Sequence, residues 1–395
     1  VIFFFFSQLM QDADATNSDG ILFKRNANMR KIDYTYWSSP VFGQILKNTG
    51  ATMNTDNSTG GFSPGTPNSR IYDYLEATDL FGATADANFV PGKGYAIRGK
   101  HNATPDVLVS NSYEFLGTPI NGTTVGANPL SITITKSPNS TVAGVSYEHG
   151  YNLIGNPYPS NINFDEFYEL NQGVINAKAW FWTNAAAHIA MIGSNYNGNN
   201  YATLNLAGGA PPTYPAGAEN YKPTQFIKVG QGFLVQANAP IPATVQSYTI
   251  TFNNDIRDTS KGVFYNGVNK NATTKDRFWV KMISPANIVN TILLAHIDGA
   301  TEQYDKNYDS ELFNIADDSF YSTLDNKKLQ IQTKAGFAID SKFPLATKFS
   351  QNGNYIFELE DPEGIFAAGQ TIYLHDKLSG VYTKLNEGNY SFSAE

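Results

Sequence analysis

The sequence predicts an all-β protein that contains an internally duplicated domain. Short apolar runs bounded by turn residues follow one another along the whole chain, as they do in β-sandwiches. The 33 Gly and 19 Pro residues are spread between these runs rather than gathered in one block. Two sequence patterns also occur twice and in the same order, which indicates a repeated structural unit.

The repeat is defined by two landmarks, a turn that contains proline and a Gly-x-Gly turn before an apolar strand. The landmark segments are residues 36–41 and 91–97 in the first copy, and residues 152–159 and 229–235 in the second. Each copy is expected to close on an alternating strand, at residues 130–135 and at residues 248–252. The Gly-x-Gly turns do not complete a phosphate-binding loop, and we interpret them as tight turns that need a positive φ.

The second copy is longer than the first. Pro40 and Pro157 lie 117 positions apart and Gly94 and Gly232 lie 138 apart, so the second copy holds 138 − 117 = 21 more residues between its landmarks. We expect this excess in residues 184–221, which include runs rich in Asn and Gly. Because binding sites tend to be built on surface loops, binding is expected where the two copies differ.

The chain divides into five segments on this basis. They are residues 1–30, lead-in strands at the end of an upstream region of β-solenoid type; residues 31–145 and 146–262, the first and second halves of the duplicated domain; residues 263–274, a polar linker; and residues 275–395, a β-sandwich-like domain. One short helix is expected at residues 164–170, with Asn163 as its N-cap and Asp165 and Glu166 in its first turn.

Composition argues against several classes of function. The formal net charge is −8 and there is no Lys/Arg cluster, which argues against nucleic acid as a partner because phosphates require a basic surface. No apolar run has the length of a transmembrane helix. The chain has no cysteine, which rules out thiol catalysis, disulfides and zinc sites with Cys ligands. The apolar residues 1–6 lack the basic segment of a signal peptide and are interpreted as a strand of a longer chain.

No catalytic constellation is evident, so the chain is not expected to be an enzyme. Residues 61–65 match the G-x-S-x-G pattern, but Ser63 is followed by Pro64, which has no N–H for an oxyanion. Two carboxylate pairs, at residues 165–166 and 317–318, are adjacent in sequence and are not placed to act as a dyad. Five histidines are scattered without the spacing of metal ligands.

Two features are candidate binding sites. Trp180 and Trp182 are two residues apart, so in a strand they share one face; such a pair stacks on sugar rings when exposed and packs in the core when buried. Asp305, Asn307 and Asp309 place side-chain oxygens at alternate positions, as calcium loops do. The EF-hand pattern is not met, and the alternative is a solvated acidic turn. No cofactor other than calcium is expected.

Several segments together resemble large surface proteins of gliding Bacteroidota that are exported by the type IX secretion system. The segments are residues 33–41, 92–95, 152–159, 230–233, 372–378 and 390–395. In that family the last two stand immediately before a C-terminal sorting domain. The resemblance covers residues 20–395 and implies no catalytic residue.

The resemblance implies a secreted, extracellular protein on the cell surface, associated with the outer membrane, with a role in adhesion or gliding. We therefore expect a non-catalytic structural or adhesion module. Its expected partners are the outer-membrane translocon or attachment machinery of type IX secretion, and surface glycans. The alternative is a carbohydrate-binding accessory region of a secreted polysaccharide-degrading enzyme, which requires Trp180 and Trp182 to be exposed.

Overall fold

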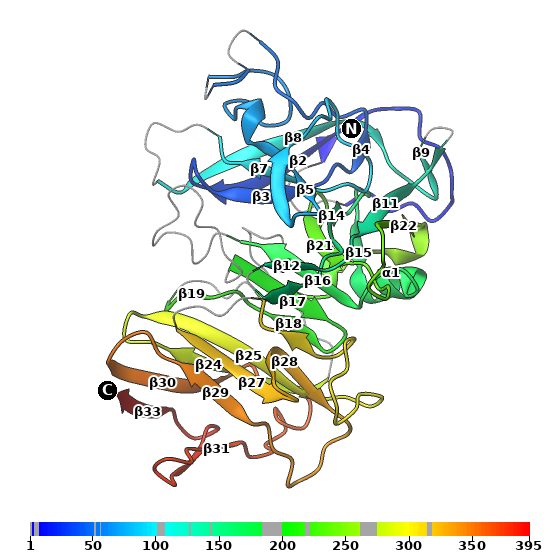
Figure 1. Cartoon of the computed structure of the whole chain (residues 1–395). Helices are drawn as coiled ribbons and strands as arrows, with labels where there is room; N and C mark the ends of the chain where they lie inside the picture. Colours follow the sequence, from blue (N-terminus) through cyan, green and yellow to red (C-terminus); the bar gives the residue numbers. More distant parts are fainter. Residues whose placement is uncertain are drawn as a thin grey trace. The chain divides into compact units, whose positions relative to one another are not determined.

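The computed structural model of the chain is built almost entirely from β-strands (Figure 1), which confirms the all-β fold class. It describes residues 2–3, 8–50, 53–55, 57–100, 107–125, 128–142, 144–183, 200–217, 222–260, 275–313 and 318–395. Within these ranges lie one α-helix, α1 (Phe164–Asn171), and the short 3-10 helices η1 (Asn68–Arg70) and η4 (Asn254–Ile256). No helix within them is long and apolar enough to cross a membrane.

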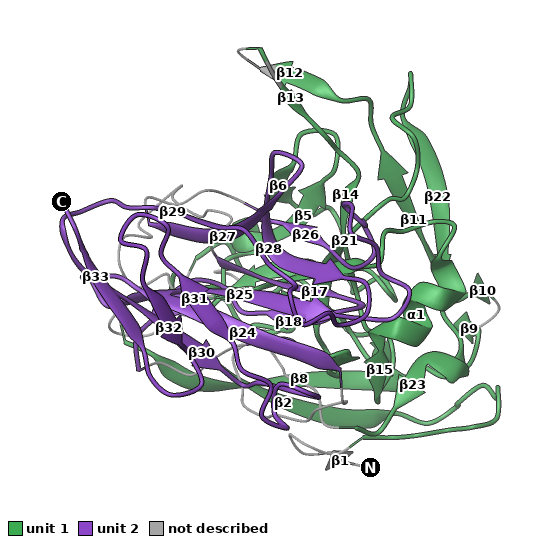
Figure 2. Ribbon diagram, turned by 90° about the horizontal axis from the view of Figure 1, so that it is seen from below, with its two compact units in different colours: residues 1–184, 224–270 green, residues 185–223, 271–395 purple. Residues whose placement is uncertain are grey.

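The chain folds as two compact units (Figure 2). Unit 1 comprises Val1–Asn184 and Thr224–Lys270, and unit 2 comprises Ala185–Pro223 and Asn271–Glu395. Both copies of the repeat lie in unit 1, but the second copy is interrupted by a segment that folds with the C-terminal residues. The expected linker, residues 263–274, lies outside the described residues.

The first copy of the repeat forms two sheets. Its strands are β2 (Ile21–Met29), β3 (Tyr34–Trp37), β4 (Val41–Phe42), β5 (Ile71–Leu75), β6 (Leu80–Ala83), β7 (Tyr95–Arg98) and β8 (Val109–Pro119). One sheet has the order β3-β7-β5-β6, and the other has the order β1-β2-β8-β4, in which β1 (Ile2–Phe3) is an edge strand. A short hairpin of β9 (Thr124–Val125) and β10 (Asn128–Pro129) leads to the second copy.

The second copy repeats this topology. Its elements in unit 1 are β11 (Ser131–Lys136), β12 (Ser140–Val142), β13 (Val145–Tyr147), β14 (Tyr151–Gly155), β15 (Asn161–Asn163), α1, β16 (Lys178–Trp182), β20 (Phe226–Ile227), β21 (Gly232–Gln236), β22 (Gln246–Thr251) and β23 (Arg257–Asp258). The order β14-β21-β16 matches β3-β7-β5, and β11 pairs antiparallel with β22 as β2 pairs with β8. The duplication in the sequence is thus a duplication of strand order.

This topology moves the boundaries of the repeat. The segment expected as a lead-in holds β2, which pairs with β8 over its whole length of nine residues, so the first copy begins at Ile21. The prediction that residues 130–135 and 248–252 are equivalent closing strands is wrong, because β11 and β22 are partners of one another, from Ser131↔Thr251 to Lys136↔Gln246. Two paired strands show the same alternation of apolar and polar residues as two strands at equivalent positions of a repeat. Sequence alone therefore cannot distinguish paired strands from equivalent strands.

A hairpin distinguishes the second copy from the first. In the first copy residues 30–33 connect β2 to β3, whereas in the second residues 137–150 connect β11 to β14 and form the hairpin β12–β13. The copies therefore differ at a second place in addition to the longer segment expected from sequence.

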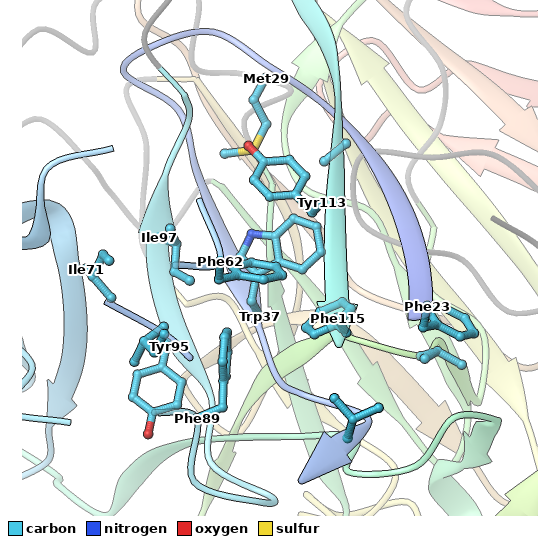
Figure 3. Packing of buried hydrophobic residues seen from close by; sticks show 14 of the residues in the cluster. Phe23, Met29, Trp37, Phe62, Ile71, Phe89, Tyr95, Ile97, Tyr113 and Phe115 are labelled. Atoms are coloured by element: carbon cyan, nitrogen blue, oxygen red, sulfur yellow. The ribbon is translucent and has the colours of Figure 1, made fainter. Parts of the chain in front are cut away.

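The core of unit 1 is aromatic (Figure 3). The Trp37 ring lies 4.6 Å from that of Tyr113 and 5.1 Å from that of Phe62, measured between ring centroids. Phe115 and Phe89 lie 4.7 and 5.1 Å from Phe62. Aromatic pairs add about 0.5–1.5 kcal/mol beyond the burial of their area. Phe62, from the polar loop before η1, is therefore the residue that anchors this loop to the core.

The helix α1 begins where the sequence predicts, at Phe164. The Asn163 side chain accepts a hydrogen bond from the Asp165 N–H at 3.1 Å, which satisfies one of the donors left unpaired at a helix N-terminus. Phe164 and Phe167 are buried and fix the apolar face of the helix.

Replacing Asn163 with alanine is expected to lower the free energy of unfolding by about 1 kcal/mol, because the cap is lost. Chemical denaturation of the whole chain measures this change, and Asn163→Ser serves as a control that keeps a capping oxygen. Equal stability of the alanine and serine variants would contradict the assignment of the cap.

Unit 2 is organised around one large sheet of order β29-β27-β28-β25-β24-β30-β33. The strands of this sheet are β24 (Asp276–Ile283), β25 (Ile288–His296), β27 (Ser319–Leu324), β28 (Lys327–Lys334), β29 (Leu345–Lys348), β30 (Gly353–Glu360) and β33 (Tyr390–Ala394), with β19 (Tyr214–Pro215) paired to β25 and β26 (Ser310–Glu311) paired to β28. Outside this sheet, β17 (Tyr201–Asn205) pairs with β18 (Gly208–Ala210), and β31 (Tyr373–His375) pairs with β32 (Tyr382–Lys384). β25 and β28 are parallel, and β24 pairs antiparallel with both β25 and β30.

This sheet is covered on both faces. Phe278 of β24 packs in a core with Phe366 and other residues that follow β30, whereas its neighbour Trp279 packs in a separate core with Ala207 and Ala210. A strand buried on both faces is an almost continuous apolar run, as β25 is. The expected β-sandwich is therefore one sheet, covered on one face by the chain after β30 and on the other by residues 200–217.

Candidate functional site

The two copies of the repeat exchange backbone hydrogen bonds at equivalent positions. The Ser38 N–H donates to the Gly230 carbonyl at 2.9 Å, and the Gly155 N–H donates to the Gly92 carbonyl at 2.9 Å. Ser38 and Gly155 are related by the 117-residue offset of the repeat, and Gly92 and Gly230 by the 138-residue offset. Gly92 and Gly230 have φ of 77° and 81°, which confirms the tight turns with positive φ.

The same exchange continues in two isolated β-bridges. Trp37 pairs antiparallel with Gln231, and Ile154 pairs antiparallel with Lys93. Each copy thus pairs its proline-turn strand with the Gly-x-Gly turn of the other copy, as two subunits do at a two-fold interface. We call this set, residues 37–38, 92–94, 154–155 and 230–232, the repeat junction.

Glycine is required at the repeat junction because backbones approach closely. A Cβ on Gly155 would lie 2.2 Å from the Cβ of Ser38, and a Cβ on Gly94 would lie 2.5 Å from the Ile154 carbonyl oxygen. Neither contact can be relieved by moving the end of a flexible side chain. The glycines that carry the repeated pattern are therefore explained by packing of one copy on the other.

The central side chains of the two Gly-x-Gly turns are held inside unit 1. The Lys93 ammonium lies 2.7 Å from the Asp86 carboxylate and 3.0 Å from that of Asp73. The Gln231 amide is buried and donates to the Tyr36 carbonyl at 3.2 Å. Both side chains are thus used in internal contacts.

The tryptophans proposed as a sugar platform are buried. Trp180 and Trp182, both in β16, are 5% and 4% exposed. The Trp180 ring meets the Tyr151 ring edge-on at 5.3 Å, and the Trp182 ring stacks on Tyr36 at 6.2 Å. This placement matches core packing and offers no open ring face for a sugar.

The proposed calcium residues form a turn that is capped by its own side chains. Asp309 is fully buried, and its carboxylate accepts hydrogen bonds from the backbone N–H groups of Asp305 (2.8 Å) and Thr333 (2.7 Å). The Asp305 carboxylate accepts one from the Asn307 N–H at 2.9 Å. These carboxylates thus hold the turn before β26 against β28. Within the described ranges, no three His, Cys, Asp or Glu side chains group as metal ligands do.

The serine of the G-x-S-x-G pattern is also buried. Ser63 has no exposed surface, and its Oγ lies 2.9 Å from the Thr66 hydroxyl. This hydroxyl stabilises the loop before η1, in agreement with the sequence argument against a nucleophile at this position.

A different serine lies beside a histidine and an aspartate. The Asp79 Oδ2 is 2.7 Å from the His149 Nδ1, and the Ser140 Oγ is 2.9 Å from the His149 Nε2. The Tyr74 hydroxyl donates to the other Asp79 oxygen at 3.0 Å. Burial raises the pKa of the Asp79 carboxyl above its ordinary value, and the bond from Tyr74 and the nearby imidazole oppose this rise. We call Asp79, His149 and Ser140 the Asp-His-Ser cluster.

A second contact fixes the strands that carry the cluster. The buried carboxylate of Glu76 accepts hydrogen bonds from the Ser137 N–H and the Ser137 hydroxyl, both at 2.8 Å. Glu76 and Ser137 each precede a member of the cluster, Asp79 and Ser140, by three positions. The turn between β5 and β6 is therefore held against the start of β12 at two points.

Sequence reasoning missed this cluster. Asp79 and His149 are 70 positions apart, and Ser140 and His149 are nine apart, so no local motif joins them. Asp79 adopts a φ of 52°, which suits an aspartate in a tight turn. The sequence feature that could have indicated this cluster is the longer connection at residues 137–150 of the second copy. This connection forms the additional hairpin, whose first strand begins at Ser140.

Lys228, between β20 and β21, is a buried cation in unit 1. Burial, together with the charge of Arg25, lowers its pKa to about 8. The pKa of Lys228 is lower in the folded chain than in the unfolded chain. Below pH 8 the lysine is charged in both states, and burial of the charge then destabilises the folded chain by its full amount. Stability rises between pH 8 and about 10.5, where the unfolded chain alone binds the proton.

Lys228→Met is expected to abolish the rise in the free energy of unfolding that the natural chain shows between pH 8 and about 10, because the titrating group is removed. The difference in stability between the two proteins should therefore change with pH over this range. Urea denaturation of both proteins from pH 7 to 10 measures this. A difference that stays constant with pH would contradict the assignment.

Together, the strand order and the repeat junction define a class of protein, an all-β scaffold built from two copies that pair reciprocally, with a further β unit. The chain belongs to a protein family described as a domain of unknown function, DUF8693, whose model matches residues 6–395. No curated protein and no solved structure matches the chain.

Proposed function

We propose that the chain is a structural and adhesion module of a cell-surface protein exported by the type IX secretion system. The observation that carries this proposal is the repeat junction. The four segments of unit 1 that resemble type IX-secreted surface proteins are the segments that contribute the junction. These motifs therefore serve to join two copies into one scaffold, which is a structural role.

The features that sequence suggested for chemistry also serve internal packing. The Trp180 and Trp182 rings are buried, and the carboxylates of Asp305 and Asp309 accept backbone hydrogen bonds within a turn. Because these side chains are already engaged in internal contacts, a structural role is favoured over ligand binding for them.

The proposed partners are the outer-membrane translocon or attachment machinery of type IX secretion, and surface glycans. The proposed location is the extracellular face of the outer membrane, with a role in gliding or surface attachment. The alternative of a carbohydrate-binding accessory region needs exposed tryptophans. All four tryptophans of the chain, Trp37, Trp180, Trp182 and Trp279, are buried, so no observation favours it.

The experiment is detection of the native protein on intact cells of a gliding bacterium that encodes it. An antibody against unit 2 is expected to bind intact cells, and protease added outside should remove the signal. Disruption of the type IX translocon should abolish the surface signal and leave the protein inside the cell. A surface signal that survives this disruption, or a protein that resists external protease in intact wild-type cells, would contradict the proposal.

A further inference from the structure

We propose that the Asp-His-Ser cluster is an acyl-transfer site, in which Ser140 is the nucleophile for an ester substrate, His149 is the general base and Asp79 orients the imidazole. This inference goes beyond the proposed structural role and does not rest on it. It also departs from the expectation of a non-catalytic chain.

The hydrogen-bond distances fit these roles. The roles require an ionised Asp79, and an ionised carboxylate only accepts hydrogen bonds, so the His149 Nδ1 then donates its proton to the Asp79 Oδ2, 2.7 Å away. The His149 Nε2 then presents its lone pair to the Ser140 hydroxyl at 2.9 Å. This is the tautomer and the connectivity that activate a serine in hydrolases, and it is recognised by geometry rather than by sequence order.

The cluster is held rigidly. Asp79 is fixed by the Tyr74 hydroxyl on its second oxygen, and the buried Glu76–Ser137 contact holds the two strands together three residues away. His149 is itself buried. A base that is locked by its neighbours loses little entropy when the reaction occurs.

The nucleophile is partly exposed at the edge of the hairpin. Ser140 is half-buried and pairs with Tyr147 across the β12–β13 ladder, so the two side chains share one face. Tyr147 is 48% exposed, and its ring can cover an aromatic or apolar group of the substrate. The Asn139 side-chain amide, from the residue before the nucleophile, donates a long 3.5 Å bond to the Ser146 hydroxyl, and we assign it as a donor to the oxyanion.

The reaction that this arrangement supports is transfer of an acyl group from an ester. The Ser140 oxygen bonds to the ester carbonyl carbon as its proton passes to the His149 Nε2. The ester C–O bond then breaks, and the leaving alcohol takes that proton. Water attacks the acyl-serine by the same route, with His149 as base, and releases the carboxylic acid. Water is the single co-reactant.

The location of the site supports the inference. The hairpin that brings Ser140 and Tyr147 is absent from the first copy, where residues 30–33 make the same connection. A part that one copy of a duplicated scaffold lacks is not needed to form the scaffold. Functional residues tend to lie on such added connections.

The test uses the full chain, a fluorophosphonate probe that phosphonylates activated serines, and p-nitrophenyl acetate as an ester. Mass spectrometry is expected to place the probe on Ser140, and Ser140→Ala should abolish both labelling and ester hydrolysis. His149→Gln and Asp79→Asn should lower the labelling rate by about 10³-fold or more.

The control is Ser247, an exposed serine on β22, and Ser247→Ala should react as the natural chain does. Thermal unfolding of each variant shows whether it is folded. The natural chain gives a decisive result even if a variant fails to fold. If the probe labels Ser140 of the natural chain no faster than it labels Ser247, the proposal is overturned. The proposal is also overturned if the natural chain does not react with the probe and the His149 variant is less stable. In that case the cluster only stabilises the position of the hairpin.

Discussion

Replacing Gly155 with alanine is expected to lower the free energy of unfolding of the chain by about 3 kcal/mol or more, because inserting a methyl group where no space exists forces the backbone apart. The new Cβ would lie 2.2 Å from the Ser38 Cβ. Separation of the two strands also weakens the Gly155–Gly92 and Ser38–Gly230 hydrogen bonds. Chemical denaturation followed by tryptophan fluorescence measures the change, since Trp37 lies beside Ser38.

A matched control is available in the same unit. Gly173, after α1, has open space where a Cβ would be placed, so Gly173→Ala is expected to change stability by less than about 1 kcal/mol. Gly94→Ala should behave like Gly155→Ala, because its Cβ would meet the Ile154 carbonyl oxygen at 2.5 Å. Similar stabilities for Gly155→Ala and Gly173→Ala would contradict the close approach of the two copies.

Trp279→Ala is expected to lower the free energy of unfolding by about 3–5 kcal/mol, as for other large aromatic side chains removed from a core. Trp279 packs on Ala207 and Ala210, and its indole N–H donates to the Gly209 carbonyl at 2.8 Å. The variant should release residues 200–217 from the sheet of unit 2. Limited proteolysis with mass spectrometry should then show cleavage within this segment that the natural chain resists.

Two further variants separate packing from the hydrogen bond. Trp279→Phe keeps most of the apolar ring and loses the bond to Gly209, so a smaller loss of about 1–3 kcal/mol is expected. Leu378, at the tip of the β31–β32 hairpin, is 98% exposed, and Leu378→Ala should change nothing measurable. Unchanged protease resistance of residues 200–217 in Trp279→Ala would show that this segment does not complete the unit.

The features that sequence predicted correctly are those set by local physics. The all-β class follows from short apolar runs, the helix α1 from Asn163 and the acidic first turn, and the turns at Gly92 and Gly230 from glycine's access to positive φ. The duplication was also visible, because the glycines of the repeat junction are required by close packing and recur at equivalent positions in the two copies.

The features that sequence did not predict depend on pairing between distant segments. The alternation of apolar and polar residues does not show that β11 and β22 are paired with one another rather than equivalent strands of the two copies. Residues 200–217 appeared as an enlarged loop of the second copy, but their small residues Ala207 and Ala210 leave room for the Trp279 ring of unit 2. A segment that lies in sequence between the two landmarks of one copy can therefore fold with a different unit of the chain.

The candidate site shows the same limit. The local G-x-S-x-G pattern around Ser63 proved to be a buried loop contact, whereas the Asp79, Ser140 and His149 side chains meet only because β5, β6 and β12 lie together. A constellation of this kind is defined in space and leaves no motif in the sequence.

We expect the two copies to form one cooperative scaffold through the repeat junction. Native-state hydrogen exchange of the Ser38 and Gly155 backbone amides tests it most directly, because these groups donate the two equivalent hydrogen bonds across the junction. We predict that both amides exchange with the same free energy, and that this value equals that of global unfolding of unit 1. Exchange of either amide by a local opening, while the other stays protected, would contradict the claim.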